Sequence, residues 1–429
     1  MIPPLLFLAL AGLSYALVSA RLATTVVTAP IFFTGLGLLA GPALGLVHLA
    51  PDDELLIQFL EAALGMVLFA DACLLDPRRF RREAMLSGRL LAIGMPLAIL
   101  AGTLVAIALW PDAAPWQAAL LATMLAPTDA AIGQAVVGNP RVPAVVRNAL
   151  NVESGVNDGL ALPLILIFIA LGFVAGGLET EVRAAQTIAV GLVGSVVTGL
   201  LVGVAGGWLL REAVRRGLAT RAWQSIALVT IAVSAFVVAD RLEASGFLAV
   251  WIAGLAAGML VRPVVAHEVF ELPEGLAQAL VAVAFLLLGA ALLGPALGRI
   301  TPQAVVYAVL SLTVVRLLPV AIAMARSGFA RATVLYVGWF GPRGLATVVF
   351  AGVIVAQAVP AASEISDVAL VTVALSIVAH GVTAAWGARR YASWFEEASA
   401  GHPGMLEAAE VAPLAAYRRG SLENLAVDR

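Results

Sequence analysis

Apolar stretches of about 20 residues alternate with short polar linkers along nearly the whole chain of 429 residues. A helix needs roughly 20 apolar residues to cross about 30 Å of hydrocarbon. The pattern therefore predicts an all-α polytopic membrane protein with about 13 transmembrane helices and no soluble domain between them. The predicted spans are approximately 2–20, 25–47, 54–75, 88–110, 115–138, 146–174, 185–210, 222–240, 244–262, 275–297, 302–325, 331–357 and 366–388.

The first span has a second interpretation as a signal peptide. Residues 1–20 are apolar, and Val18-Ser-Ala20 resembles a cleavage site. A secretory signal also carries a positively charged segment before its apolar region, which these residues lack. A first transmembrane helix is therefore favoured.

The composition agrees with a membrane protein, because 62% of the residues are hydrophobic and 12% are charged, whereas soluble domains are about a quarter charged. The net charge of −2 gives no indication of a nucleic-acid partner. The single cysteine, Cys73, excludes an intramolecular disulfide and a cysteine metal cluster. All 25 basic residues are arginine.

The arginines are unevenly distributed between the two sets of linkers. Seventeen follow odd-numbered spans, whereas only Arg183, Arg241 and Arg299 follow even-numbered spans. Cytoplasmic linkers are enriched in basic residues. We therefore predict a bacterial-type cytoplasmic membrane protein with its N-terminus outside and its C-terminus in the cytoplasm, where residues 391–429 form a short tail.

Proline and glycine interrupt two of the predicted helices. The fifth contains Ala126-Pro127-Thr128-Asp129, and the twelfth contains Gly341-Pro342-Arg343-Gly344. Proline removes a backbone donor and clashes with the preceding turn, and glycine adds freedom beside it. An offset of seven spans relates the two as inverted repeats, and such paired interruptions point to a transporter binding site.

A broken helix exposes N–H groups with partial positive charge and carbonyls with partial negative charge. If the two broken helices cross, like ends meet, and Asp129 offsets the positive ends while Arg343 offsets the negative ends. Alternatively, Asp129 only caps a half-helix and Arg343 extends to the membrane surface. Arg343 lies about 12 residues into its span, which is deep for that extension, and the repeat argument favours the crossing.

The sixth span carries the polar sequence Asn-Val-Glu-Ser-Gly-Val-Asn-Asp at residues 151–158, where hydrocarbon is expected. Ser154 and Asp158 lie roughly 40° apart around a helix and share a face. With carbonyls freed at Thr128, they make an oxygen site that suits a hard monovalent cation. Because a bare carboxylate at this depth is too costly, Asp158 must hold a proton or a cation. Competition between the two is antiporter chemistry; alternatively, Asp158 is only hydrogen-bonded to a neighbouring helix.

Other polar side chains in the spans have less specific interpretations. Glu153 needs a partner of opposite charge, and the mid-span Arg316 is the candidate. The pair is interpreted as a structural ion pair rather than as part of the transport site. Asp71 either lines an access path or lies at the membrane interface. His380 is favoured as a hydrogen-bonded packing histidine over a proton carrier.

Five stretches together resemble the cation/proton antiporter superfamily, and within it the NhaP/NHE-type sodium/proton exchangers. Their order and spacing agree with that family from about residue 70 to 385. The stretches are Pro127-Thr128-Asp129, Glu153-Ser154-x-x-Asn157-Asp158, Gly341-Pro342-Arg343-Gly344, Gly246-Phe-Leu-Ala-Val250 with Ala253-Gly-Leu255, and His380-Gly-Val-Thr383. The chain departs from the usual family pattern at Ala130 and around Asp71-Ala-Cys73, and the second departure bears on cation choice.

The resemblance implies one transmembrane transporter domain over residues 1–390. An elevator-like core would comprise helices at about 88–174 and 302–388, and helices at about 1–75 and 185–297 would form a homodimer interface. The resemblance also implies residue roles: Asp158 binds Na⁺ or a proton in turn, Ser154, Asp129 and Thr128 assist, Asn157 orders the unwound helix, Arg343 compensates helix ends, and Glu153 pairs with Arg316.

The expected activity is electroneutral exchange of Na⁺ or Li⁺ for protons. Asn157 cannot ionise, and the chain has no lysine, whereas the electrogenic branch of the superfamily has an aspartate and a lysine partner. K⁺/H⁺ antiport on the same scaffold is one alternative, and a non-transporting membrane sensor is another. An enzyme is disfavoured because metal and nucleophile motifs are missing. The sequence has no phosphate-binding loop, so nothing in it suggests that ATP hydrolysis drives transport. No cofactor is expected.

Overall fold

The structure is a computed structural model that describes residues 4–22, 25–47, 49–75, 85–129, 131–402 and 404–409. Within those ranges the regular elements are all helical. Eight helices are long and apolar enough to cross a membrane by length and composition, and shorter apolar helices accompany them. This confirms the predicted all-α membrane fold, while the count of thirteen crossings stays a prediction. Ala130, the arginine run at 78–82 and residues 410–429 lie outside the described residues.

The helices follow the predicted spans closely. They are α1 (Pro4–Leu22), α2 (Ala29–Leu38), α3 (Glu54–Leu74), α5 (Met95–Leu109), α6 (Pro115–Met124), α7 (Gln134–Val137), α8 (Ala144–Ala175), α9 (Glu181–Ala189), α10 (Ser195–Arg215), α11 (Arg221–Arg241), α12 (Gly246–Val261), α13 (Glu271–Leu287), α14 (Gly294–Gly298), α15 (Pro302–Leu312), α16 (Val314–Ala323), α17 (Arg331–Trp339), α18 (Leu345–Ala356) and α19 (Ala362–Gly401). Short π-helical turns at Leu39–Ala43, Leu90–Gly94, Val190–Gly194 and Leu288–Leu293 adjoin α2, α5, α10 and α13.

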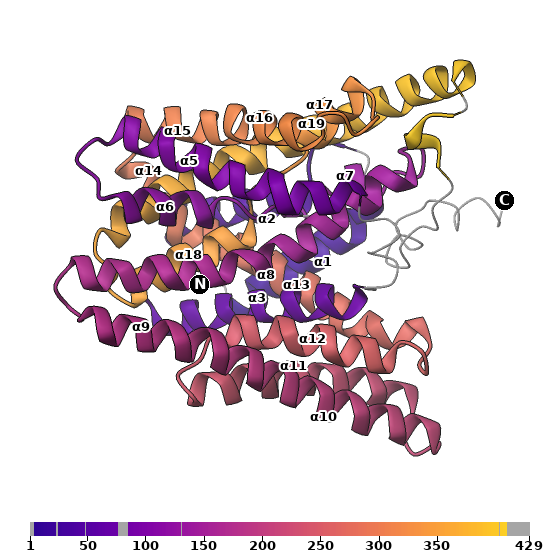
Figure 1. Cartoon of the computed structure of the whole chain (residues 1–429), viewed down its shortest axis with the longest axis horizontal. Helices are drawn as coiled ribbons and strands as arrows, with labels where there is room; N and C mark the ends of the chain where they lie inside the picture. The colour runs from indigo at the N-terminus through magenta and orange to yellow at the C-terminus, as the bar shows by residue number, and fades with distance from the viewer. Residues whose placement is uncertain are drawn as a thin grey trace.

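Two groups of helices lie on opposite sides of the molecule (Figure 1). Helices α10, α11 and α12 pack together on one side, and α3 packs on α12. Helices α5, α15, α16 and α19 lie on the other side. Helix α8 runs between them and contacts α12 and α3 on one flank and α6 on the other. The long helix with the polar sequence is therefore placed at the boundary between the groups.

The helices α3, α10 and α12 form a closely packed unit, which we call the frame. A Cβ added at Gly203 of α10 would lie 2.6 Å from the Ala253 carbonyl oxygen of α12. A Cβ added at Gly254 of α12 would lie 2.7 Å from the Phe69 carbonyl oxygen of α3. Small residues allow such close backbone approach, which is how helices associate in lipid. The glycines of these spans therefore fix the spacing of the frame.

The fifth and twelfth helices are broken where the sequence predicts. Helix α6 ends at Met124 and the next helical turn, α7, begins at Gln134. Helix α17 ends at Trp339 and α18 begins at Leu345. Each predicted span is thus a pair of half-helices separated, among the described residues, by a non-helical segment.

The last helix is longer than the hydropathy pattern predicts. The span at 366–388 is part of α19, which continues to Gly401 inside the predicted tail. Apolar character ends near Arg389, but the residues that follow up to Gly401 include the good helix formers Arg, Ala and Glu and contain no proline. Tyr391 also stacks on Tyr336 with ring centroids 4.0 Å apart, which anchors the extension to α17. The hydropathy pattern located the end of the apolar span and missed the end of the helix.

Candidate ion-binding site

The two helix breaks cross in direct contact. The Asp129 N–H donates to the Pro342 carbonyl at 2.8 Å, so the two non-helical segments touch through their backbones. The Asp129 carboxylate accepts from the N–H of Leu345, the first residue of α18, and from that of Ala131, at 2.8 Å each. Both carboxylate oxygens thus face N–H groups, one of them at the positive end of α18. Gly344 leaves room for this, because a side chain there would overlap Asp129.

Arg343 lies at the opposite, negative ends of the half-helices. Its side chain is 1% exposed, and Nη1 donates to the carbonyls of Ala126 at 2.7 Å and Pro127 at 3.3 Å. These carbonyls follow the end of α6 and lack helical partners. Arg343 therefore does not extend to the membrane surface, and the structure has the crossing arrangement rather than the alternative.

Glu153 and Arg316 form a buried ion pair between α8 and α16. Arg316 Nη1 and Nη2 donate to the two carboxylate oxygens at 2.5 and 2.8 Å, and the residues are 2% and 3% exposed. Gly341 of the second break packs against the guanidinium, where a side chain would overlap it. The pair lies behind the crossing and does not line the cavity described below. This position is consistent with a structural role.

Two side chains of α8 hold the non-helical segment of the fifth helix at Thr128. Ser154 Oγ donates to the Thr128 carbonyl at 2.6 Å. Asn157 Nδ2 donates to Thr128 Oγ1 at 2.8 Å. Asn157 Oδ1 and Asp158 Oδ1 are both buried without a hydrogen-bond partner among the described residues, and of the two residues only the aspartate can ionise. The structure thus brings Thr128, Ser154, Asn157 and Asp158 together, and the aspartate is the ionisable member with an unused oxygen.

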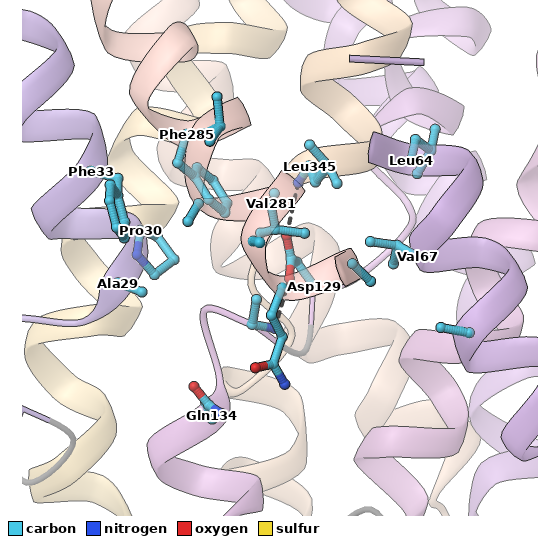
Figure 2. Close-up of a pocket in the computed structure, with 18 of the residues that line it drawn as sticks. Ala29, Pro30, Phe33, Leu64, Val67, Asp129, Gln134, Val281, Phe285 and Leu345 are labelled. Atoms are coloured by element: carbon cyan, nitrogen blue, oxygen red, sulfur yellow. Dashed lines mark hydrogen bonds between the residues drawn. The ribbon is translucent and has the colours of Figure 1, made fainter. Parts of the chain in front are cut away.

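A cavity of about 650 Å³ opens beside these residues. Thr128, Asp129, Ser154 and Asp158 line it, and so does Asp71 of α3. Figure 2 shows Asp129 on its wall, hydrogen-bonded to Leu345 and surrounded by apolar side chains of α2, α3 and α13.

The cavity wall includes exposed residues such as Gln134 and Gln278, so the cavity reaches the protein surface. Of the two sequence interpretations of Asp71, its position on this wall fits the access path.

Glu274 also lines the cavity, and the sequence analysis missed it. It lies in the first turn of α13, and its Oε1 has no hydrogen-bond partner within the described part of the chain. The predicted span began at residue 275, so hydropathy assigned this acid to a linker. An acidic residue one position before an apolar span is a weak signal, because acidic residues are common at helix N-termini.

His380 is fully buried and lies away from the cavity wall. Its Nε2 lies 3.0 Å from the carbonyl of Trp339, the last residue of α17, and its Nδ1 lies 3.1 Å from Ser376 Oγ. Ser376 Oγ also accepts the Arg343 N–H at 2.7 Å. A ring that carries its hydrogen on Nε2 satisfies all three bonds. His380 therefore ties α19 to the second break, as expected for a packing histidine.

The comparisons with known proteins agree with this architecture. The family model described as "Sodium/hydrogen exchanger, transmembrane" matches residues 5–389. The chain is 27% identical over 386 residues to the K⁺/H⁺ antiporter NhaP of Alkalimonas amylolytica, covering 88% of this chain and 64% of that protein. It is 31% identical over 234 residues to the uncharacterized Na⁺/H⁺ exchanger YjcE of Escherichia coli (strain K12), covering 52% of this chain and 39% of that protein.

The fold is similar to that of the sodium proton antiporter MjNhaP1 from Methanocaldococcus jannaschii. The TM-score is 0.71 at 18% sequence identity, with 90% of this chain and 96% of that chain covered. The chain spans at most about two thirds of the length of the two curated relatives. Since the family match runs through nearly all of the described helices, the chain belongs to the sodium/hydrogen exchanger family.

Proposed function

We propose that the protein exchanges a monovalent cation for protons by alternating access, and that Asp158 binds the two in turn. The proposal rests on one observation, the unpartnered Asp158 Oδ1 beside a cavity that reaches the surface. An ionised carboxylate without a partner in low-dielectric surroundings is costly, so Asp158 takes either a proton or a cation. Each excludes the other, and this exclusion couples their movements.

The neighbouring groups divide into ligands and supports. Ser154 Oγ and the Thr128 carbonyl are oxygen atoms on the same wall and join Asp158 around the cation. Asp129 assists from its position at the positive end of α18, because both its oxygens already accept N–H groups. Asn157 holds the non-helical segment at Thr128 and adds no charge, which supports exchange of one cation for one proton. An imposed membrane potential is therefore expected to leave the exchange rate unchanged.

The cation is Na⁺ or Li⁺ in this proposal, with K⁺ as the second candidate. Oxygen ligands accept all three ions, and the choice depends on small differences in cavity size. K⁺ is supported by the name of the NhaP relative and Na⁺ by that of YjcE.

In this proposal the cavity mouth faces the cytoplasm. The arginine distribution supports this, since Asp71 lies near the end of α3 and Glu274 at the start of α13. The N-terminus then lies outside, in the cytoplasmic membrane of the cell. The helices at about 1–75 and 185–297 are proposed to face a second copy in a homodimer.

The test is proton movement in everted membrane vesicles, followed with a pH-sensitive dye after addition of Na⁺, Li⁺ or K⁺. Wild type is expected to respond to at least one cation, and Asp158→Asn to none. The matched control is Asp112→Asn, which makes the same chemical change at an exposed loop residue. Full exchange by Asp158→Asn at a normal protein level would overturn the proposal and favour a non-transporting role for this residue.

The dependence on pH provides a second readout in the same vesicles. At low pH the proton occupies Asp158 and excludes the cation, whereas at high pH few protons are available for exchange. The rate at fixed cation concentration is therefore expected to rise and then fall as pH increases. A flat rate from about pH 5 to 9 contradicts competition for one carboxylate.

A further inference from the structure

Trp251 of α12 makes a contact that the proposed function does not use. Its indole Nε1 donates to the Gly155 carbonyl of α8 at 3.1 Å. The ring lies over Gly159, where an added Cβ would be 2.8 Å from Nε1. The two glycines are one turn apart on the same face of α8. The indole therefore occupies a notch that is open because residue 159 has no side chain.

The two sides of this contact are held in different ways. Helix α12 belongs to the frame, in which Gly203 and Gly254 bring backbones into close contact. By contrast, α8 meets α12 at this point through a large side chain and one hydrogen bond. Relative movement between α8 and the frame requires the loss of that bond, whereas movement within the frame requires the separation of interlocked backbones.

The contact lies on the helix that carries the ion-binding carboxylate. Gly159 directly follows Asp158, and a Cβ at Gly155 would be 3.4 Å from the Cβ of Asp71 on α3. Alternating access requires one helical group to move against another around the site. Since Asp158 lies on α8 and Asp71 lies on the frame, the α8–frame boundary is a surface along which that movement changes access.

We propose that Trp251 is a positioning residue whose bond to Gly155 holds α8 against the frame in the cavity-open arrangement, and that its release is a step of the exchange cycle. This inference rests on the proposed function for the cycle, but the contact can be tested without transport. The Gly155 carbonyl keeps its helical partner when the indole leaves, so the bond can break and reform without stranding an acceptor. The net free energy that one such hydrogen bond contributes shifts a two-state equilibrium about five-fold.

The first experiment removes the indole N–H and keeps an aromatic ring. Trp251→Phe is compared with Trp208→Phe, a matched change at a residue that is 55% exposed on α10. Both are placed in a Cys73→Ala background with Gln134→Cys on the cavity wall, and the purified protein is labelled with a charged maleimide in detergent. We expect Trp251→Phe to slow labelling at position 134 about two- to five-fold, and Trp208→Phe to leave it unchanged. An unchanged rate in Trp251→Phe overturns the inference.

The second experiment tests release directly. Trp251→Cys and Gly159→Cys are combined in the Cys73→Ala background and joined with a short, reducible bis-thiosulfonate linker. We expect exchange in vesicles to fall at least ten-fold on linking and to recover on reduction, while the Trp251→Cys single variant is unaffected by the reagent. Undiminished exchange in the linked protein shows a static contact and overturns the inference. If wild type itself exchanges no cation, the proposed function fails, and the labelling experiment still decides whether Trp251 holds α8.

Discussion

The crossing of the broken helices and the frame are both held together inside a membrane, but by different interactions. At the crossing, Asp129 and Arg343 compensate the ends of half-helices through hydrogen bonds to backbone groups. In the frame, Gly203 and Gly254 allow backbones to touch through van der Waals contact. Lipid is as apolar as the helices, so apolar burial alone does not hold helices together in a membrane. Each region therefore depends on a contact that lipid cannot supply.

The difference indicates which kind of substitution destabilises each region most. Backbone groups exposed by a helix break have no water to bond in the membrane interior, so the crossing depends on the charge and donor pattern of a few side chains. The frame contains no such requirement at its glycine contacts and depends on volume. A change of charge at constant size is expected to harm the crossing, and a change of size without charge is expected to harm the frame.

The largest effect is expected from Glu153→Gln, which keeps the side-chain size and leaves Arg316 buried without its counter-charge. Removal of one partner of a buried ion pair costs about 3–5 kcal/mol, which thermal unfolding in detergent will show as a large fall in midpoint. Glu397→Gln, at an exposed position on α19, is the control and is expected to have little effect.

The double variant Glu153→Leu with Arg316→Met sharpens the same point. Replacement of both partners by apolar residues removes the unmatched charge and is expected to recover most of the stability. If the double variant is as unstable as Glu153→Gln, the pair acts through shape rather than charge. That result would contradict the claim that this region, unlike the frame, is sensitive to charge.

The crossing was the more predictable region, because its information is local in the sequence. Proline beside glycine in an apolar span predicts a break, and a charged residue within each break indicates what offsets the helix ends. The contact between Glu153 and Arg316 followed from the cost of a lone buried charge. These inferences needed residue types and depth, which hydropathy provides.

What the sequence did not reveal depends on contacts between distant segments. Glu407 is 2% exposed and accepts hydrogen bonds from the Ala330 N–H at 2.8 Å and from Thr333 Oγ1 at 2.6 Å. It thereby caps the start of α17 from inside the predicted tail, which has no apolar span to mark it. Glu274 and the notch filled by Trp251 were missed for the same reason, since periodicity places a residue on a face but does not identify the facing element.

A smaller effect is expected from Gly203→Ala in the frame. The added methyl group would lie 2.6 Å from the Ala253 carbonyl oxygen, so α10 and α12 must separate, at a cost of about 1–3 kcal/mol for an overpacked contact. Gly35→Ala on α2 is the matched control, because a Cβ there meets nothing within 4 Å. The control is expected to be neutral or slightly stabilising. Equal midpoints for the two variants would show that close backbone approach does not hold the frame.

The smallest effect is expected where a charged pair is exposed. Arg299 binds Asp367 of α19 through two hydrogen bonds of 2.7 Å, the same two-pronged geometry as the buried pair. The Arg299 side chain is 56% exposed, however, and such pairs contribute about 0.2–1 kcal/mol. Arg299→Gln is therefore expected to lower the unfolding midpoint slightly, and high salt is expected to remove the difference by screening. A loss as large as that of Glu153→Gln would mean that geometry, rather than burial, sets the strength of ion pairs in this protein.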